Sequence, residues 1–185
     1  MVAHKWTEGQ LKQQAKNAVY RHFDAAKTRD FGPLATMHLG EDDLFSKFDY
    51  SAPLKRQDYS QAVMHEEVAY SNITDFNYKI DDLRIDLPTH EVAIATFHLE
   101  TGGLFVNDYR FEGSPARTNL RATMVFLWKE EIPDKTVVNT ELQPRIPTRA
   151  PGPHWVIIHE HYSSFPDEPP KPPPKQGSTL KSART

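Results

Sequence analysis

The chain changes its hydrophobic period once, near Thr74, and this change constrains the fold more than any other sequence feature. Upstream, apolar residues between positions 8 and 28 recur at helical spacing behind a Thr7-x-x-Gln10 capping box. Downstream, apolar and polar residues alternate, which is typical of half-buried strands. Helices that precede long strands, instead of alternating with them, predict an α+β arrangement.

The same patterns predict the individual elements. A turn at 30–33 leads into a short second helix that ends near Gly40, and a third helix covers 60–73. A change of phase at 81–82 predicts a β-bulge, and the two glycines at 102–103 should break or bend the sheet. The expected strands lie at 44–50, 78–87, 92–99, 105–111, 117–128 and 155–163, with a short edge strand at 135–139.

Composition limits the classes of function. The 185 residues, 38% of them hydrophobic, suffice for one domain with a core. A net charge of -3 gives no reason to expect nucleic acid or a membrane surface as partner. The absence of cysteine excludes disulfides, thiolate metal sites and a cysteine nucleophile. The N-terminus carries no signal peptide pattern and no apolar run approaches a membrane span, so we expect a soluble, cytoplasmic protein.

The domain is expected to cover residues 1–166 and to contain a long, proline-rich loop at 129–154. A loop of this length is usually functional or mobile. Residues 167–185 form a proline-rich tail that is expected to be disordered, because runs of proline exclude helix and central strand. The loop or the tail could contact a protein partner, although an unstructured, solubilising tail is the simpler interpretation.

Two strand motifs carry a family resemblance. Arg-x-Thr at 121–123, followed by Trp-x-x-x-His-x-His-x-Ser at 155–163, resembles the SnoaL-like branch of the nuclear-transport-factor-2-like superfamily. The last strand is also similar to that of the association domain of calcium/calmodulin-dependent protein kinase II. The resemblance implies a cone-shaped, curved antiparallel sheet packed on about three helices, an α+β barrel of cystatin-like arrangement. It also implies dimerisation through the sheet. The chain departs from the family at 129–154, where members usually have a tight hairpin.

A candidate ligand site follows from alternation in the last strand. Residues two apart share a face, so Trp155, His159 and His161 should point to the same side. We hypothesise that Arg121, His159 and His161 form the polar end of a pocket for a small anionic or carbonyl-bearing molecule. Trp155 and Tyr59 would supply its apolar wall.

A structural interpretation competes with this hypothesis. Arg121 could pair with Glu160 or Glu66, because a buried arginine needs a carboxylate. The two histidines of the last strand would then bind backbone groups or face a subunit interface. Glu66 lies on an apolar helical face, where a carboxylate could have a raised pKa and act as a base. His22 and His98 are each expected to be satisfied core histidines.

Three functions remain open at this point. The chain could be a small-molecule-binding or assembly module, an enzyme of isomerase, dehydratase or cyclase type, or a structural subunit of a larger complex. In the enzyme, His159, His161 or Glu66 would transfer a proton on a small hydrophobic carbonyl substrate. A metal site made of His98, His159 and His161 ranks below the organic pocket, so no metal and no cofactor are expected.

Overall fold

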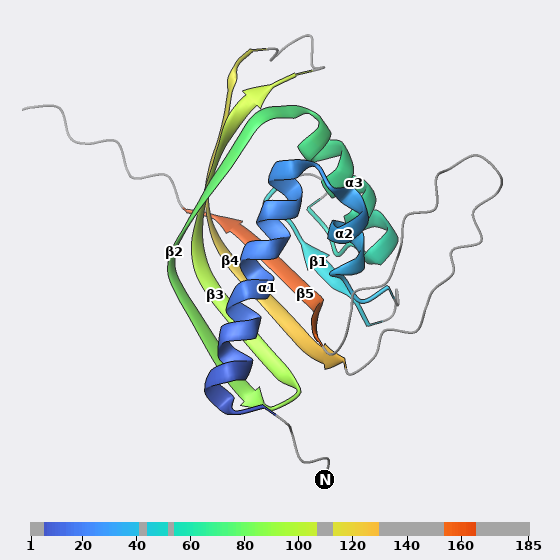
Figure 1. Cartoon of the computed structure of the whole chain (residues 1–185). Helices are drawn as coiled ribbons and strands as arrows, with labels where there is room; N and C mark the ends of the chain where they lie inside the picture. The colour runs from blue at the N-terminus through green and yellow to red at the C-terminus, as the bar shows by residue number, and fades with distance from the viewer. Residues whose placement is uncertain (1–5, 41–43, 52–53, 107–112, 130–153, 166–185) are drawn as a thin grey trace, which may run out of the picture.

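A curved sheet of five strands wraps around one side of the helices in the computed structural model, which describes residues 6–40, 44–51, 54–106, 113–129 and 154–165 (Figure 1). The strand order is β1-β5-β4-β3-β2. β1 runs parallel to β5, and the other neighbours are antiparallel. The elements are α1 (Glu8–Thr28), α2 (Phe31–Thr36), β1 (Ser46–Phe48), α3 (Tyr59–Ser71), β2 (Ile73–Thr89), β3 (Val92–Phe105), β4 (Pro115–Lys129) and β5 (His154–Ser164).

The predicted α+β class and the curved sheet are confirmed. The described strands do not close into a barrel, because β1 and β2 are the two edges of the sheet that they form. None of the helices in the described part of the chain is long and apolar enough to cross a membrane.

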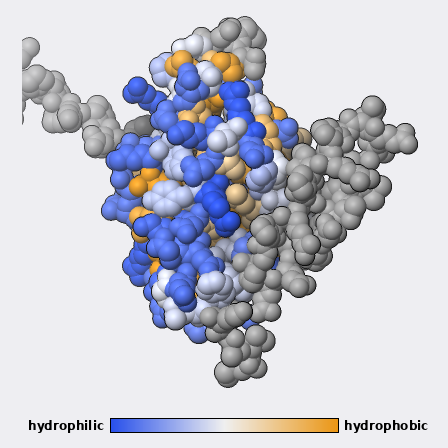
Figure 2. All heavy atoms as spheres, viewed as in Figure 1, coloured by the Kyte–Doolittle hydropathy of each residue, from blue (hydrophilic) through white to orange (hydrophobic). Residues whose placement is uncertain are grey.

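Helix α1 begins and ends where its sequence predicts. Thr7 and Gln10 form the reciprocal capping box, and Arg29 ends the helix in the left-handed conformation at φ 56°. The buried face of α1 packs on β2, β3 and β5, while hydrophilic residues cover most of the surface in the same view (Figure 2). The core beneath it includes the alternating inward residues of β4, which are Leu120, Ala122, Met124, Phe126 and Trp128.

Several local predictions have a definite outcome. The bulge in β2 is confirmed, because the register with β3 shifts between Asp81 and Arg84 and Asp82 has φ 53°. The second helix ends at Thr36, before Gly40. Of the two outcomes expected at 102–103, a break or a bend, the break is wrong, since β3 continues through both glycines. The loop residues 130–153, with the edge strand at 135–139, lie outside the described residues. So do positions 107–112 and the tail at 167–185.

Gly103 permits a close approach of β2 to β3 near the start of β2. A Cβ atom at this position would lie 2.8 Å from the carbonyl oxygen of Thr74 and would also meet the side chain of Ile73. A backbone oxygen cannot move aside as a flexible side chain can. Glycine is therefore required here for packing.

We predict that Gly103→Ala lowers the free energy of unfolding by about 1–3 kcal/mol, the usual cost of forcing extra atoms into a packed region. Gly9→Ala is the control, because a Cβ there meets no atom within 4 Å. The measurement is urea denaturation followed by circular dichroism. An equal effect of the two substitutions would contradict the close approach.

Candidate functional site

A bulge in β5 decides which side chains of the last strand reach the interior. Trp155 pairs with Trp128, and Ile157 pairs with Phe126, so both face inward with the core side of β4. The register with β4 then shifts by one residue at Ile158. After this point the inward positions of β5 are 160 and 162, while 159 and 161 face outward.

The bulge overturns one prediction about the last strand. Trp155 does not share a face with His159 and His161, because simple alternation stops at Ile158. The bulge also brings Glu160 and Tyr162 into the core, and Glu160 is 0% exposed.

Three charged side chains meet at this inward face. Lys47 comes from β1, Glu66 from α3 and Glu160 from β5, and each is buried. The ammonium nitrogen of Lys47 lies 2.5 Å from Glu66 Oε1 and 3.0 Å from Glu160 Oε2. The backbone of Lys47 lies between β5 and Gln57, and it exchanges two hydrogen bonds with the backbone of Gln57. The lysine thus joins two carboxylates from separate elements.

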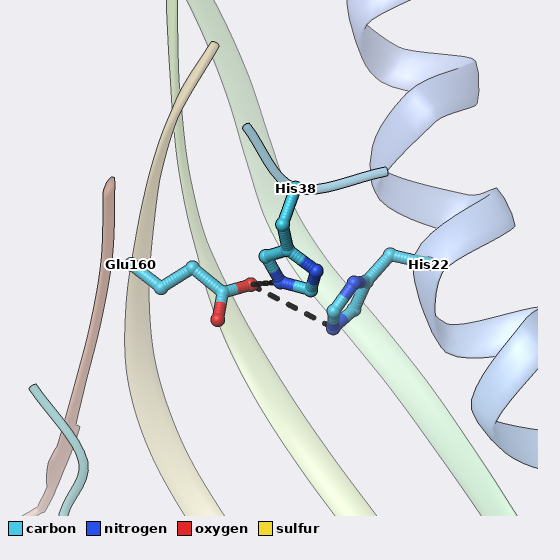
Figure 3. Close-up of side chains that lie close together, drawn as sticks. All are labelled: His22, His38 and Glu160. Atoms are coloured by element: carbon cyan, nitrogen blue, oxygen red, sulfur yellow. Dashed lines mark ion pairs between the residues drawn. The ribbon is translucent and has the colours of Figure 1, made fainter. Parts of the chain in front are cut away.

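Two buried histidines lie against the same carboxylate (Figure 3). His22 projects from α1, with its Nε2 3.7 Å from Glu160 Oε1. His38 follows α2 and has its Nε2 3.6 Å from the same oxygen and 3.7 Å from Glu66 Oε1. Met37 and Leu39 hydrogen-bond to Ile157, which fixes His38 beside β5 at the bulge.

The five side chains Lys47, Glu66, Glu160, His22 and His38 form what we call the charge cluster. Burial opposes the charged form of Glu160, but Lys47, His22 and His38 outweigh it and hold the pKa of this carboxyl well below its usual range. Burial also opposes the charged form of Lys47, yet Glu160 and Glu66 raise its pKa well above the ordinary value. Two carboxylates and one ammonium leave one negative charge when both histidines are neutral.

The two histidines respond differently to this surplus charge. Burial acts against the charged form of both rings. For His38 the attraction of Glu66 and Glu160 wins and raises the pKa, whereas for His22 burial wins and the pKa is lowered. A proton on His38 would make the charge cluster neutral.

A cavity of about 470 Å³ opens beside the charge cluster. Lys47, Glu66, Tyr70 and Tyr162 form part of its wall. Its apolar wall includes Phe23, Phe76, Leu99 and Leu120, and its rim carries Asp49, His65 and Arg117. A second hollow of about 570 Å³, between β2, β3 and the start of β4, contains none of the buried ionisable groups.

Two tyrosines place hydroxyl groups at the polar end of the cavity. Tyr162 donates to Glu160 Oε1 over 3.3 Å, and Tyr70 stacks edge-on against Phe76. Burial, with the nearby carboxylates, raises the pKa of both phenols. Both therefore stay protonated and can donate hydrogen bonds. The second oxygen of Glu66, Oε2, is buried and has no hydrogen-bond partner within the described ranges.

Most residues expected to bind a ligand lie elsewhere. Arg121 is exposed on the outer face, with its guanidinium 5.1 Å from the ring centroid of Phe165. His159 and His161 flank the exposed Phe48 on that face. Their role in ligand binding stays a prediction, and it would concern the outer face of the sheet.

Trp155 and Tyr59 are not among the residues that line the cavity. Trp155 is buried and donates its indole N–H to the carbonyl of Leu11 over 3.2 Å. Tyr59 is half-buried, with its ring 6.3 Å from that of Phe45. Both therefore contribute to packing.

The alternative pairing of Arg121 with Glu66 or Glu160 is wrong, because both carboxylates pair with Lys47. His98 is not a core residue, since it is exposed and lies 3.5 Å from Asp82. Its place on the outer face follows from its register opposite Arg121.

Sequence reasoning identified Glu66 and missed the rest of the charge cluster. Lys47 and His38 lie in short segments without a motif, and His22 was expected to be a satisfied core histidine. His22 is buried, but no described residue forms a hydrogen bond with either of its ring nitrogens. One signal for Glu160 was present. The four apolar residues at 155–158 interrupt alternation, and such a run can mark a bulge.

The fold is that of nuclear-transport-factor-2-like proteins. A candidate dehydratase of this family from Streptomyces avermitilis superposes with a TM-score of 0.62 at 15% identity, covering 86% of this chain and 99% of the other. A nuclear transport factor 2-like superfamily protein from Salmonella enterica serovar Typhimurium gives 0.60 at 17% identity, covering 94% and 99%. The predicted resemblance is thereby confirmed at the level of the fold.

The predicted similarity to a kinase association domain is also confirmed for the fold. The association domain of calcium/calmodulin-dependent protein kinase II from Caenorhabditis elegans gives a TM-score of 0.55 at 15% identity, covering 85% of this chain and 98% of the other. No protein-family model matches the sequence, and no curated protein matches it. Neighbours that include both a candidate dehydratase and an association domain do not decide the function.

We predict that Lys47→Met destabilises the fold by about 3–5 kcal/mol, the usual cost of leaving a buried carboxylate without its partner. Lys79→Met is the matched control, because Lys79 pairs with Asp81 at the exposed surface and its loss should have little effect. Urea denaturation at neutral pH measures both variants. If Lys47→Met lowers the free energy of unfolding no more than the control does, the two carboxylates are neutralised without the lysine.

Proposed function

We propose that this chain is a small-molecule-binding module whose ligand occupies the cavity beside the charge cluster. The observation that supports this most directly is Glu66. Its Oε2 is buried and has no hydrogen-bond partner in the described part of the chain, and the residue forms part of the cavity wall. A buried carboxylate oxygen without a partner is costly, and a ligand that donates a hydrogen bond would remove that cost.

The lining also suggests the chemical class of the ligand. The apolar wall from Phe23, Phe76 and Leu99 suits a hydrocarbon or aromatic body. Lys47 and the phenol of Tyr70 can donate to a carbonyl oxygen, and Glu66 can accept from a hydroxyl group. We therefore infer a small, largely apolar molecule that carries a carbonyl group, a hydroxyl group or both.

Proton transfer on such a ligand is the second candidate function, and the position of Glu66 favours it. Glu66 Oε1 pairs with Lys47, and its other oxygen at the cavity wall is positioned to accept a proton from a bound ligand, as a general base does. The Glu66 carboxylate would remove a proton from the carbon atom next to the ligand carbonyl. The enzyme would then be of isomerase, dehydratase or cyclase type.

We predict that small cyclic ketones and phenols bind the wild-type protein in saturation-transfer NMR. Ala69→Phe, which fills the cavity from α3, should weaken binding about tenfold or more, equivalent to ~1.4 kcal/mol. Glu66→Gln should selectively weaken the ligands that carry a hydroxyl group. If Glu66 is a base, the wild type in D₂O will also exchange the hydrogens on the carbons next to the ketone carbonyl for deuterium. Glu66→Gln will not catalyse this exchange.

His161→Gln is the control for this experiment, because His161 lies on the outer face of the sheet. It should bind the same compounds as the wild type. Unchanged binding by Ala69→Phe, or loss of binding in His161→Gln, would place the ligand outside the cavity.

Self-association through the sheet is a third function, and the outer face supports it. The three described helices all lie on the inner side of the sheet (Figure 1). On the outer side Phe48 is 41% exposed, with its ring 6.2 Å from the rings of both His159 and His161. Aromatic residues are enriched at the centres of protein–protein interfaces. We propose that two copies meet through this face.

We predict that the wild type is a dimer and that Phe48→Lys is a monomer, because a buried lysine without a partner would oppose association. Val68→Lys is the control, since Val68 is a 56% exposed apolar residue on α3, away from this face. Sedimentation equilibrium over a range of concentrations gives the mass of each. A monomeric wild type, or dissociation by the control, would contradict the proposal.

A further inference from the structure

We propose that His22, His38 and Glu160 bind a divalent transition-metal ion, with zinc and cobalt as the best-matched elements. The three side chains converge from α1, from the segment after α2 and from β5 (Figure 3). Their nearest ligand atoms all lie within 4.8 Å of one another, and the three residues are buried. None of the three lines the cavity of the proposed organic ligand, so this is a separate site.

The distances fit metal ligands better than hydrogen bonds. Glu160 Oε1 lies 3.7 Å from His22 Nε2 and 3.6 Å from His38 Nε2. A charge-assisted hydrogen bond between such atoms would be about 2.7–2.9 Å long. Around a tetrahedral zinc ion with bonds of about 2.0–2.2 Å, neighbouring ligand atoms lie about 3.4 Å apart. A small inward shift would therefore place an ion between the three atoms.

His38 is oriented as a metal ligand. Its Nδ1 lies 3.1 Å from the carbonyl oxygen of Leu34, an acceptor, so Nδ1 carries the proton and donates. In the neutral ring this leaves a lone pair on Nε2, which faces Glu160. Histidines that bind metals commonly donate their other nitrogen to a backbone carbonyl in the same way.

Unpartnered polar atoms at the centre of the cluster support a missing ligand. Neither ring nitrogen of His22 has a hydrogen-bond partner among the residues that the structure describes, and the same holds for Nε2 of His38. Both imidazoles are fully buried. Buried polar groups are nearly always satisfied, so the two Nε2 atoms that face Glu160 require an explanation. A bound ion would satisfy the two nitrogens that face Glu160.

The ligand set selects the type of metal. Two imidazoles and one carboxylate suit zinc and its neighbours in the first transition row, whereas calcium and magnesium prefer oxygen ligands alone. Two histidines and one glutamate also leave a fourth position in a tetrahedral site. Glu66 Oε1, 3.7 Å from His38 Nε2, is the closest protein candidate for it.

The charges set a condition on any further ligand of the metal, because the charge of Glu66 is already counted in the charge cluster. With both histidines neutral, the charge cluster carries one surplus negative charge, and a divalent ion would change this to one surplus positive charge. A hydroxide or another anion on the metal would restore neutrality, as burial demands. A proton on His38 is the competing solution, because it neutralises the cluster without a metal. The two solutions differ in whether the protein takes up metal ions.

The test uses the tag-free full chain, treated with chelator and then titrated separately with ZnCl₂ and CoCl₂. We expect one ion per chain in isothermal titration calorimetry. The cobalt form should show the intense visible bands of a four-coordinate site. We also expect zinc to raise the thermal unfolding midpoint. His22→Gln and Glu160→Gln should each weaken zinc binding by about tenfold or more.

His159→Gln/His161→Gln is the matched control, because it removes two histidines from the outer face and leaves the charge cluster intact. Circular dichroism confirms that each variant is folded. If His22→Gln or Glu160→Gln does not fold, the wild-type cobalt spectrum and stoichiometry still decide. No uptake by the wild type would overturn the proposal and leave the proton on His38 as the solution. Loss of binding in the outer-face control, with retention in His22→Gln, would overturn it too.

Discussion

The ion pairs of Lys47 with Glu66 and Glu160 hold α3 against β1 and β5, with which this helix shares few other contacts. β1 has only three residues, yet its central side chain reaches α3 on one side and β5 on the other. Removing three charges from water is expensive, and only close pairing makes it tolerable. The arrangement therefore requires β1, α3 and β5 to be placed accurately at the same time. The cavity wall that Lys47 and Glu66 share depends on that placement.

The bulge at Ile158 is the backbone feature that makes the charge cluster possible. Without it, residue 160 would face outward and His159 would face the core. The segment 37–39 hydrogen-bonds to Ile157 immediately before the bulge, so the same place in β5 also positions His38. One extra residue in one strand thus selects which ionisable side chains become buried. Bulges often re-aim side chains near functional sites in this way.

Local pattern predicted the elements well and the site poorly. α1 could be delimited because its capping box and its apolar stripe agree, and the β2 bulge because the alternation slips at 81–82. The cluster could not be predicted, since its members are 22, 38, 47, 66 and 160 in sequence and meet only through tertiary packing. Glu66 was found because a carboxylate on an apolar helix face is visible locally. Lys47 was not, since a single lysine in a short strand carries no such signal.

The cavity and the charge cluster are electrostatically linked, because Lys47 and Glu66 belong to both. Any change of charge on one side is felt on the other through a medium of low dielectric constant. A ligand that donates to Glu66 would draw this carboxylate away from Lys47 and strengthen the hold of Lys47 on Glu160. A positive charge placed between the histidines would in turn favour an anionic or carbonyl-bearing ligand in the cavity. The fold supplies the hollow, but the occupant of the cluster would set which ligand the hollow prefers.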